Sequence, residues 1–342
     1  MKKKPKTSFV SAQQVADLAG VSRSAVSRTF TKGASVSPAT RSKVLKAADK
    51  LGYHVNELAR GLINDQSNIV CIVGADIYTP YQSRFIDALT RELQAIQKVA
   101  IVVNSSGDVG VRDALAQTIR YRADATLVLS GQPDDALIQT CLNNGQRVIV
   151  VNRDKMQSGV ESIVVTNRVA AREAFHMLHR AGCRSIVAVS SKAGTPSLVA
   201  REQAFLEEAK THGIEATLKT IGMTSYETGA ETARQLFSGS NPPDGAFCLT
   251  DLLACGFMDV ARHEFGRRIP EDLCVIGFDD IDQSSWSSYN LTTFRQPVED
   301  IAAYIRDLLT SQPTESESAD ESPTRFATEP VWRQSVRMGT TT

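Results

Sequence analysis

The stretch SAQQVADLAGVSRSAVSRTF, residues 11–30, predicts two short helices joined by a tight glycine turn. Ser11 suits a helix N-cap, and Gln14 three positions later completes a capping box. Gly20 permits the left-handed backbone that the turn requires, and Ser22 is a suitable cap for the second helix. The pattern is typical of a helix-turn-helix, whose second helix enters the DNA major groove.

Apolar residues divide each of these helices into an inner and an outer face. The residues expected to face inward are Val15, Ala16, Leu18, Ala19, Val21, Val26 and Phe30. The outer face of the second helix then carries Arg23, Ser24, Ser27 and Arg28. A third helix is predicted to follow, with Ser37 as its cap, Pro38 in its first turn and Gly52 at its end. A three-helix domain without DNA binding is the alternative.

The charge of the chain is unevenly distributed. Residues 1–63 contain 12 Lys and Arg against 3 Asp and Glu, a net charge of +9, while the whole chain has a net charge of zero. A basic head on an acidic body is typical of a nucleic-acid-binding protein whose second part has another task. The basic arm, residues 1–9, either contacts phosphates or is merely solvated.

Length and composition indicate a cytoplasmic protein of two or three domains. The 342 residues contain no apolar run of about 18 residues that would cross a membrane, and MKKKPK is too short and polar for a secretory signal. The six cysteines have no CxxC spacing, and several lie in strand-like apolar runs. Buried, reduced thiols are therefore expected, and no metal site.

Beyond residue 68, short apolar runs alternate with helix-length segments. Runs of Val and Ile without polar alternation are typical of parallel strands buried on both faces. The alternation predicts doubly wound α/β sheets, and its length favours two of them. The expected strands are residues 69–75, 99–104, 125–130, 147–152, 162–166, 185–190, 245–250 and 273–278. Ligands of such folds bind at the carboxyl ends of the strands.

The first part of the chain closely resembles the lactose-repressor (LacI/GalR) family of bacterial transcription regulators. The matching pieces are VADLAGVSRSAVSRTF, ASVSPATRSKVLKAADKLGY and NELARGL, followed more thinly by IGFDD, LTTFRQP and VWRQSV. The resemblance implies a basic arm (1–9), a helix-turn-helix domain (10–55) and a hinge helix (56–64). It also implies a periplasmic-binding-protein-like (type I) core of two subdomains, residues 65–161 with 292–312 and residues 162–291 with 325–337. The acidic segment 313–324 reads as a disordered loop.

Residues that touch DNA follow from the same resemblance. The major-groove positions match Ser22, Arg23, Ser24, Ala25, Ser27 and Arg28. Arginine pairs bidentately with guanine, although a phosphate contact remains the alternative for Arg23, and phosphate positioning is favoured for Ser27. The hinge positions match Asn56, Ala59 and Leu62, where paired leucines from two subunits wedge open a central base step. Val55 stands where the family usually has proline, which suggests a less stiff linker.

An effector pocket between the two subdomains is also implied. The matching positions are Tyr81, Asn152, Arg153, Arg201, Thr250, Asp251, Phe278, Asp279 and Gln296. An aspartate and an arginine in one cleft suit the vicinal hydroxyls of a sugar or sugar derivative, with an aromatic ring stacked on it. Thr250-Asp251, Thr166-Asn167 and Thr79-Pro80-Tyr81 depart from the family's usual residues, so the identity of the effector stays open.

Partners follow from this architecture. We expect a homodimer on a pseudo-palindromic operator in double-stranded DNA, because two wedges are needed at its centre. The dimer interface is expected around helices 82–98 and 110–122. A tetramer is not expected, since no heptad tail follows residue 334.

Catalysis finds little support in the sequence. No G-x-G-x-x-G follows a strand, and neither a P-loop nor a G-x-S-x-G elbow is present. His176 and His179 lie three residues apart on a predicted helix, but no acidic or cysteine ligand set supports a metal site there, so neither catalysis nor a cofactor is expected. The rival hypotheses are a sugar-binding receptor module without DNA output and an α/β sugar-metabolising enzyme.

Overall fold

The computed structural model describes residues 9–31, 33–56, 66–106, 110–129, 135–152, 157–311 and 322–337. The chain divides into two compact units, Met1–Ser67 and Asn68–Thr342, and each is described by itself. Within the described ranges, none of the helices combines the length and the apolarity needed to cross a bilayer.

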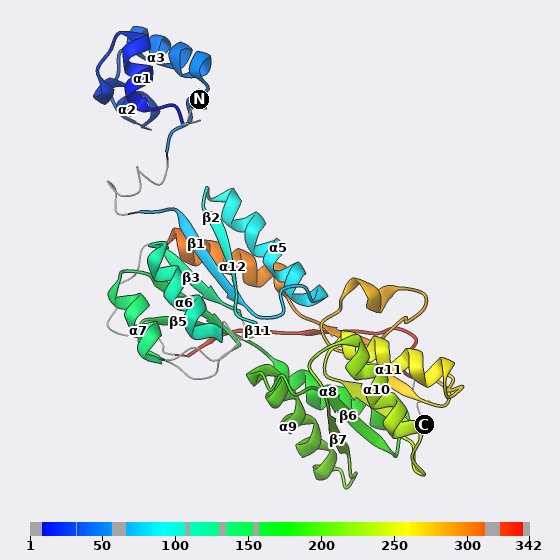
Figure 1. Ribbon diagram of the computed structural model, residues 1–342. Helices are drawn as coiled ribbons and strands as arrows, with labels where there is room; N and C mark the ends of the chain where they lie inside the picture. Colours follow the sequence, from blue (N-terminus) through cyan, green and yellow to red (C-terminus); the bar gives the residue numbers. More distant parts are fainter. Residues whose placement is uncertain are drawn as a thin grey trace, which may run out of the picture. The chain divides into compact units, whose positions relative to one another are not determined.

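In the first unit, the described residues form helices α1 (Ala12–Ala19), α2 (Arg23–Phe30) and α3 (Pro38–Leu51) (Figure 1). The predicted capping box is confirmed, because the Ser11 side chain accepts from the Gln14 backbone while the Gln14 side chain accepts from the Ser11 backbone. Gly20 ends α1 with φ 63°, and Gly52 ends α3 with φ 65°. Local sequence rules therefore determine where these helices begin and end.

A small core holds the three helices together. Its buried residues are Val15, Ala16, Val26, Val44, Ala47 and Ala48. Leu18, which was expected to face inward, is 47% exposed. The prediction for Leu18 was wrong because α1 contributes Val15 and Ala16 to this small core, and Leu18 lies on the helix surface beyond them.

The second unit begins with a six-stranded parallel sheet in the order β11-β5-β4-β3-β1-β2. Its strands are β1 (Ile69–Gly74), β2 (Val99–Asn104), β3 (Ala125–Val128), β4 (Arg147–Val151), β5 (Val160–Val165) and β11 (Thr324–Phe326). Helices α5 (Pro80–Ala95) and α12 (Val298–Thr310) cover one face (Figure 1). Helices α6 (Gly110–Arg120) and α7 (Asp135–Asn143) cover the other.

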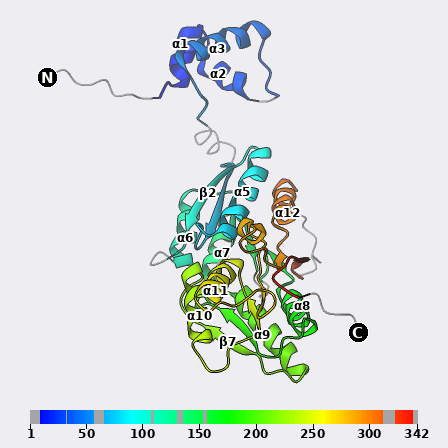
Figure 2. The ribbon, with the colours of Figure 1, turned by 90° about the vertical axis from the view of Figure 1, so that its right-hand side faces the viewer.

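A second parallel sheet has the order β7-β6-β8-β9. Its strands are β6 (Ile186–Ser190), β7 (Thr217–Thr220), β8 (Gly245–Cys248) and β9 (Cys274–Ile276). Helices α8 (Asn167–Arg180) and α9 (Pro196–Thr211) pack on one face, and α10 (Tyr226–Phe237) and α11 (Asp251–His263) on the other (Figure 2). The expectation of two doubly wound sheets is confirmed.

The boundary between the two subdomains differs from the predicted one. Strand β5 was expected to open the second subdomain, but it pairs with β4 in the first sheet. The segment 325–337 was likewise assigned to the second subdomain, yet β11 pairs with β5. Thr324, predicted to end the acidic loop, begins β11, while residues 313–321 of that segment lie outside the described ranges. Apolar runs show where strands are, whereas sheet membership depends on pairing partners distant in sequence.

Strand β10 (Thr293–Arg295) and strand β12 (Glu329–Val331) form a small antiparallel pair. The chain passes from the second subdomain through β10 to α12 on the first sheet, and it returns through β11 to β12. Together with the step from β5 to α8, these segments connect the subdomains. The short η2 turn (Asp282–Ser285) follows the loop after β9.

Strand β2 departs from the expected burial. Its sequence VAIVVN predicts burial on both faces, but Val99 is 60% exposed and Val102 is 40% exposed. The reason is its position, because β2 pairs only with β1 and forms the edge of the first sheet.

Two glycines set the distance between α10 and α11. A β-carbon at Gly229 would lie 2.0 Å from the Leu253 carbonyl oxygen, and one at Gly256 would lie 1.9 Å from the Tyr226 carbonyl oxygen. The two helix backbones are therefore in direct contact at these positions, and a side chain at either would force them apart.

We predict that Gly256→Ala lowers the free energy of unfolding by about 3 kcal/mol, as expected for overpacking where backbone would have to move. Gly74→Ala is the matched control, because its β-carbon would meet the Ile77 side chain at 3.6 Å, an ordinary contact. Urea unfolding followed by circular dichroism measures both variants. Equal stability of the two variants would contradict the backbone contact.

Candidate functional site

The second helix of the first unit presents a polar, basic face. Ser22, Arg23, Ser24, Ser27 and Arg28 are exposed, and Ala25 is half-buried beside them. The opposite face buries Val26 and Thr29. This arrangement follows from local chemistry, because the Ser22 side chain caps the helix by accepting from the Ala25 amide at 3.3 Å.

Exposed guanidinium groups on one helix face can reach base edges or phosphates. Arg28 has only a long hydrogen bond to a described residue, from Nε to the Ser24 carbonyl oxygen at 3.4 Å. Among the predicted hinge residues, Asn56 is the last described residue of its segment, and Ala59 and Leu62 lie outside the described ranges.

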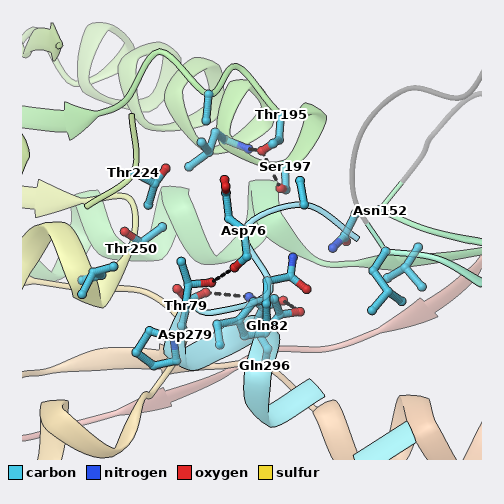
Figure 3. Close-up of a pocket in the computed structure, with 18 of the residues that line it drawn as sticks. Asp76, Thr79, Gln82, Asn152, Thr195, Ser197, Thr224, Thr250, Asp279 and Gln296 are labelled. Carbon is cyan, nitrogen blue, oxygen red and sulfur yellow. Dashed lines mark hydrogen bonds between the residues drawn. The ribbon is translucent and has the colours of Figure 1, made fainter. Parts of the chain in front are cut away.

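The second unit contains a cleft between its two subdomains, at the carboxyl ends of the strands of both sheets. The cleft encloses about 960 Å³ of space, part of which is open to solvent. Figure 3 shows polar side chains from both subdomains pointing into it. Its polar lining consists of Asp76, Thr79, Tyr81, Gln82, Asn152, Thr195, Ser197, Arg201, Thr224, Thr250, Asp279 and Gln296.

Six of the nine residues predicted for the pocket line this cleft: Tyr81, Asn152, Arg201, Thr250, Asp279 and Gln296. Arg153 lies outside the described residues. Asp251 and Phe278 are not part of the lining, and both are completely buried.

Arg201 is the charged centre of the cleft wall. It is 3% exposed, and its Nε donates to Asn167 Oδ1 at 2.8 Å while its Nη1 donates to the Leu249 carbonyl oxygen at 2.6 Å. Phe278 lies beneath the guanidinium, with 3.4 Å between the centroid of its ring and Arg201 Cζ. Phe278 therefore supports Arg201 by a cation–π contact and was wrongly predicted to touch the effector. Burial lowers the pKa of Arg201 to about 10, so the group stays charged at neutral pH.

A chain of hydrogen bonds joins the two subdomains at the base of the cleft. Tyr81 on α5 donates its hydroxyl to Gln296 Oε1 at 3.0 Å, and Gln296 Nε2 donates to Asp279 Oδ1 at 2.7 Å. Burial raises the pKa of Asp279, although Arg201 and Gln296 oppose the shift. Asp279 also has a φ of 128°, a conformation that L-residues rarely adopt and that is retained mainly at functional sites.

Asp251 has a structural role, which corrects the prediction that it binds the effector. Its carboxylate accepts from the Ile281 backbone amide at 3.0 Å and from the Thr293 hydroxyl at 2.6 Å. A β-carbon at Gly277 would lie only 2.0 Å from Asp251 Oδ1, so the carboxylate occupies the space over that glycine. Asp251 thus holds the loop that presents Asp279 to the cleft. Burial and the nearby charge of Asp279 raise the pKa of Asp251.

Asp280 points away from the cleft. Its two carboxylate oxygens pair with Arg295 at 2.7 Å and with Arg333 at 2.6 Å. Burial raises the pKa of Asp280, but hydrogen bonds from Arg333 and Arg295 outweigh burial, and the net shift is downward. The two adjacent carboxylates therefore have separate tasks. Asp279 lines the cleft, whereas Asp280 joins β10 to the C-terminal segment through its ion pairs with Arg295 and Arg333.

Further polar residues of the lining were missing from the predicted set: Asp76, Thr79, Gln82, Thr195, Ser197 and Thr224. A signal for Asp76 was present, because it follows strand β1 directly. Thr79 and Thr195 precede α5 and α9 as N-cap residues, and helix N-termini also lie at the carboxyl edge of a parallel sheet. Ser197 lies in the first turn of α9, and Thr224 lies in the connection between β7 and α10, whose course depends on the sheet order that the sequence leaves open.

Comparisons with known proteins agree with this architecture. Residues 12–56 match the family model "Bacterial regulatory proteins, lacI family", and residues 175–336 match the "Periplasmic binding protein-like domain". The HTH-type transcriptional repressor CytR of Escherichia coli (strain K12) is 28% identical over 320 residues, which cover 91% of this chain and 92% of CytR.

Two solved structures share the fold. The lac repressor dimer bound to operator and the anti-inducer ONPF has a TM-score of 0.84 at 21% identity, covering 96% of this chain and 99% of that chain. A LacI family transcriptional regulator from Enterococcus faecium with bound ribose has a TM-score of 0.70 at 22% identity, covering 78% and 98%. Identities at this level show a common fold.

We predict that Asp251→Ala lowers the free energy of unfolding by roughly 2–5 kcal/mol, because two buried donors lose their acceptor. Asp251→Asn is expected to lose less, since the Thr293 hydroxyl can turn to accept from the new amide. Chemical denaturation of the two variants beside the parent protein measures the difference. An alanine variant as stable as the parent would show that the carboxylate does not hold the loop.

Proposed function

Because the chain belongs to the LacI family of bacterial regulatory proteins, we propose that it is a DNA-binding transcriptional repressor whose operator affinity is tuned by a small sugar-like ligand. The observation that carries the proposal is the exposed Arg23, Ser24 and Arg28 face of α2, in a helix-turn-helix on a basic first unit. A cleft with hydroxyl, amide and carboxylate side chains in the second unit supplies the means of control.

On DNA, α2 acts as the recognition helix. Arg23 and Arg28 offer paired N–H donors that match the O6 and N7 acceptors of guanine, and Ser22 and Ser27 suit phosphates. CytR is named a transcriptional repressor, and the lac repressor in the matched structure is bound to an operator. Both support the assignment of the same task to this chain.

In the cleft, the chemistry suits a polyhydroxylated ligand. Asp279 and Asp76 offer acceptors, Arg201 offers a donor, and the Tyr81 ring provides an apolar wall. Gln82 Oε1 is buried and accepts no hydrogen bond from the residues that the structure describes, so it is available to a ligand hydroxyl. The Enterococcus faecium regulator holds ribose, which supports a sugar or sugar derivative here.

Ligand binding can reach the rest of the molecule through the base of the cleft. Tyr81 and Gln296 link α5 to the Asp279 loop, and Arg84 on α5 donates to the Asp280 carbonyl oxygen at 3.3 Å. A ligand that bonds to both sides of the cleft favours one relative position of the subdomains. The equilibrium between two arrangements of the subdomains then shifts toward the one that binds the ligand more tightly. The free energy of this shift is set by the difference in ligand affinity between the two arrangements.

We further propose that the protein acts as a homodimer on a pseudo-palindromic operator. Val99 and Val102 on the edge strand β2 and Tyr121 after α6 are exposed apolar side chains on the first subdomain. Strand β2 and α6 are neighbours, and an exposed edge of this kind is suited to pairing with a second copy. The site of action is the bacterial chromosome in the cytoplasm, and regulation rather than catalysis is the task.

We predict that Arg23→Ala relaxes base preference at one operator position, with a loss of about 1–3 kcal/mol against the preferred base. The operator is first selected from a random duplex pool with the full chain, and variants are compared by fluorescence anisotropy. Lys46→Ala, which removes an exposed positive charge from α3, is the matched control and should keep the base profile. An unchanged profile in the Arg23 variant would refute the contact.

We predict that Asp279→Ala abolishes the response of DNA binding to the effector but leaves DNA affinity without effector intact. A panel of sugars and sugar acids, screened by thermal shift and then by release from or retention on the selected operator, identifies the ligand. Asp282→Ala, an exposed carboxylate three residues further, serves as control. An Asp279 variant that responds like the parent would disprove this pocket.

A further inference from the structure

Three of the five histidines of the chain gather on the α8–α9 face of the second sheet. His176 and His179 lie on α8, and His212 follows the last residue of α9. The sequence pattern indicated no set of acidic ligands for the pair on α8. The fold supplies one, because α9 packs against α8 and brings Glu208 and His212 to His176.

The donor atoms have the spacing of a metal site. His176 Nε2 lies 3.1 Å from Glu208 Oε1, and His212 Nδ1 lies 3.7 Å from the same oxygen. The three donor atoms all lie within 4.8 Å of one another. Donors around a tetrahedral zinc ion with bonds of about 2.0–2.1 Å lie about 3.4 Å apart. His212 Nδ1 also lies 3.0 Å from the Glu208 carbonyl oxygen, so a metal ion would replace that hydrogen bond as the side chains rotate into position.

Phe175 fixes the rings around this position. Its side chain is completely buried, and its ring centroid lies 5.5 Å from that of His176, 5.5 Å from that of His179 and 5.3 Å from that of His212. The imidazoles of His176 and His212 stand at 87° to each other with centroids 5.0 Å apart. Ligands held by packing bind metal more tightly than free ones, because less conformational freedom is lost.

Access and charge also suit a cation. The side chains of His176 and Glu208 are 38% and 19% exposed, so an ion can enter from solvent. Arg172 lies 3.6 Å from Glu208 Oε2 and leaves Oε1 to the histidines. Glu208 and His212 are four residues apart, the spacing that places two ligands on one side of a helix.

We propose that His176, Glu208 and His212 form a binding site for a divalent transition-metal ion of the zinc class, with water completing the coordination. Two imidazoles and one carboxylate are ligands that zinc prefers. The ion would join the ends of α8 and α9. Nearer their N-termini these helices are already joined by the hydrogen bond from Arg201 to Asn167, so the metal would hold α8 against α9, whose first turns line the cleft.

The test uses the full chain, stripped of metal and titrated with Zn²⁺ against a chromophoric chelator. We expect one tight site per chain and a rise in melting temperature with zinc, since an ion that binds the folded state stabilises it. His176→Gln, His212→Gln and Glu208→Gln should each weaken binding by more than the roughly 10- to 100-fold typical of losing an outer-shell partner. His263→Gln, which changes an exposed histidine on α11, should bind like the parent.

Cobalt distinguishes this site from the cysteines. A Co²⁺ complex of the parent should show visible ligand-field bands without a thiolate charge-transfer band in the near ultraviolet. Melting curves without metal should coincide for parent and variants, because the changed histidines are partly exposed. A thiolate band, zinc affinity unchanged in the His176 and His212 variants, or no zinc binding by the parent would each overturn the proposal. Operator binding is a separate measurement, so its failure would leave the zinc result interpretable.

Discussion

The cleft depends on a single buried cation. Arg201 is removed from water, and a guanidinium in such a place must be compensated or the fold loses several kcal/mol. Asn167 from α8, the Leu249 carbonyl after β8 and the ring of Phe278 provide this compensation, while the nearby charge of Asp279 opposes the lowering of the arginine pKa. Because these groups come from α8 and from the segments after β8 and β9, satisfying one charge draws the strand ends of the second sheet into one wall.

The acidic residues around that wall divide their tasks according to burial and partners. Asp251 is enclosed and accepts two hydrogen bonds that hold the loop after β9, and only a glycine at position 277 leaves room for it. Asp280 is neutralised by two arginines. Asp279 has an unusual φ and faces the cleft. There it accepts a hydrogen bond from Gln296, which in turn accepts one from Tyr81 of the first subdomain. The loop after β9 is thus held by Asp251 and by the partners of Asp280, and through Asp279 it is hydrogen-bonded to the first subdomain.

Local rules allowed the bounds of the three helices of the first unit to be predicted. Capping by Ser11, Ser22 and Ser37 and the left-handed glycines depend on residues within four positions of one another, so the sequence contains the whole cause. The same holds for the alternation of strands and helices. The prediction failed where structure depends on a distant partner. Val99 and Val102 of β2 are exposed because no described strand pairs with its outer edge, and the sheet of β5 and β11 was misassigned.

By itself, the sequence determined the helix-turn-helix with its exposed arginines and the two α/β sheets, since periodicity and caps are local properties. The family resemblance added six of the residues that line the cleft. Only the tertiary structure decided what each polar group does. It turned Asp251 and Phe278 from ligand contacts into supports, added Gln82 and Thr195 to the cleft, and placed Glu208 beside His176. These pairings join residues about 30 or more positions apart, and such contacts arise from how helices and sheets pack, which no short-range pattern specifies.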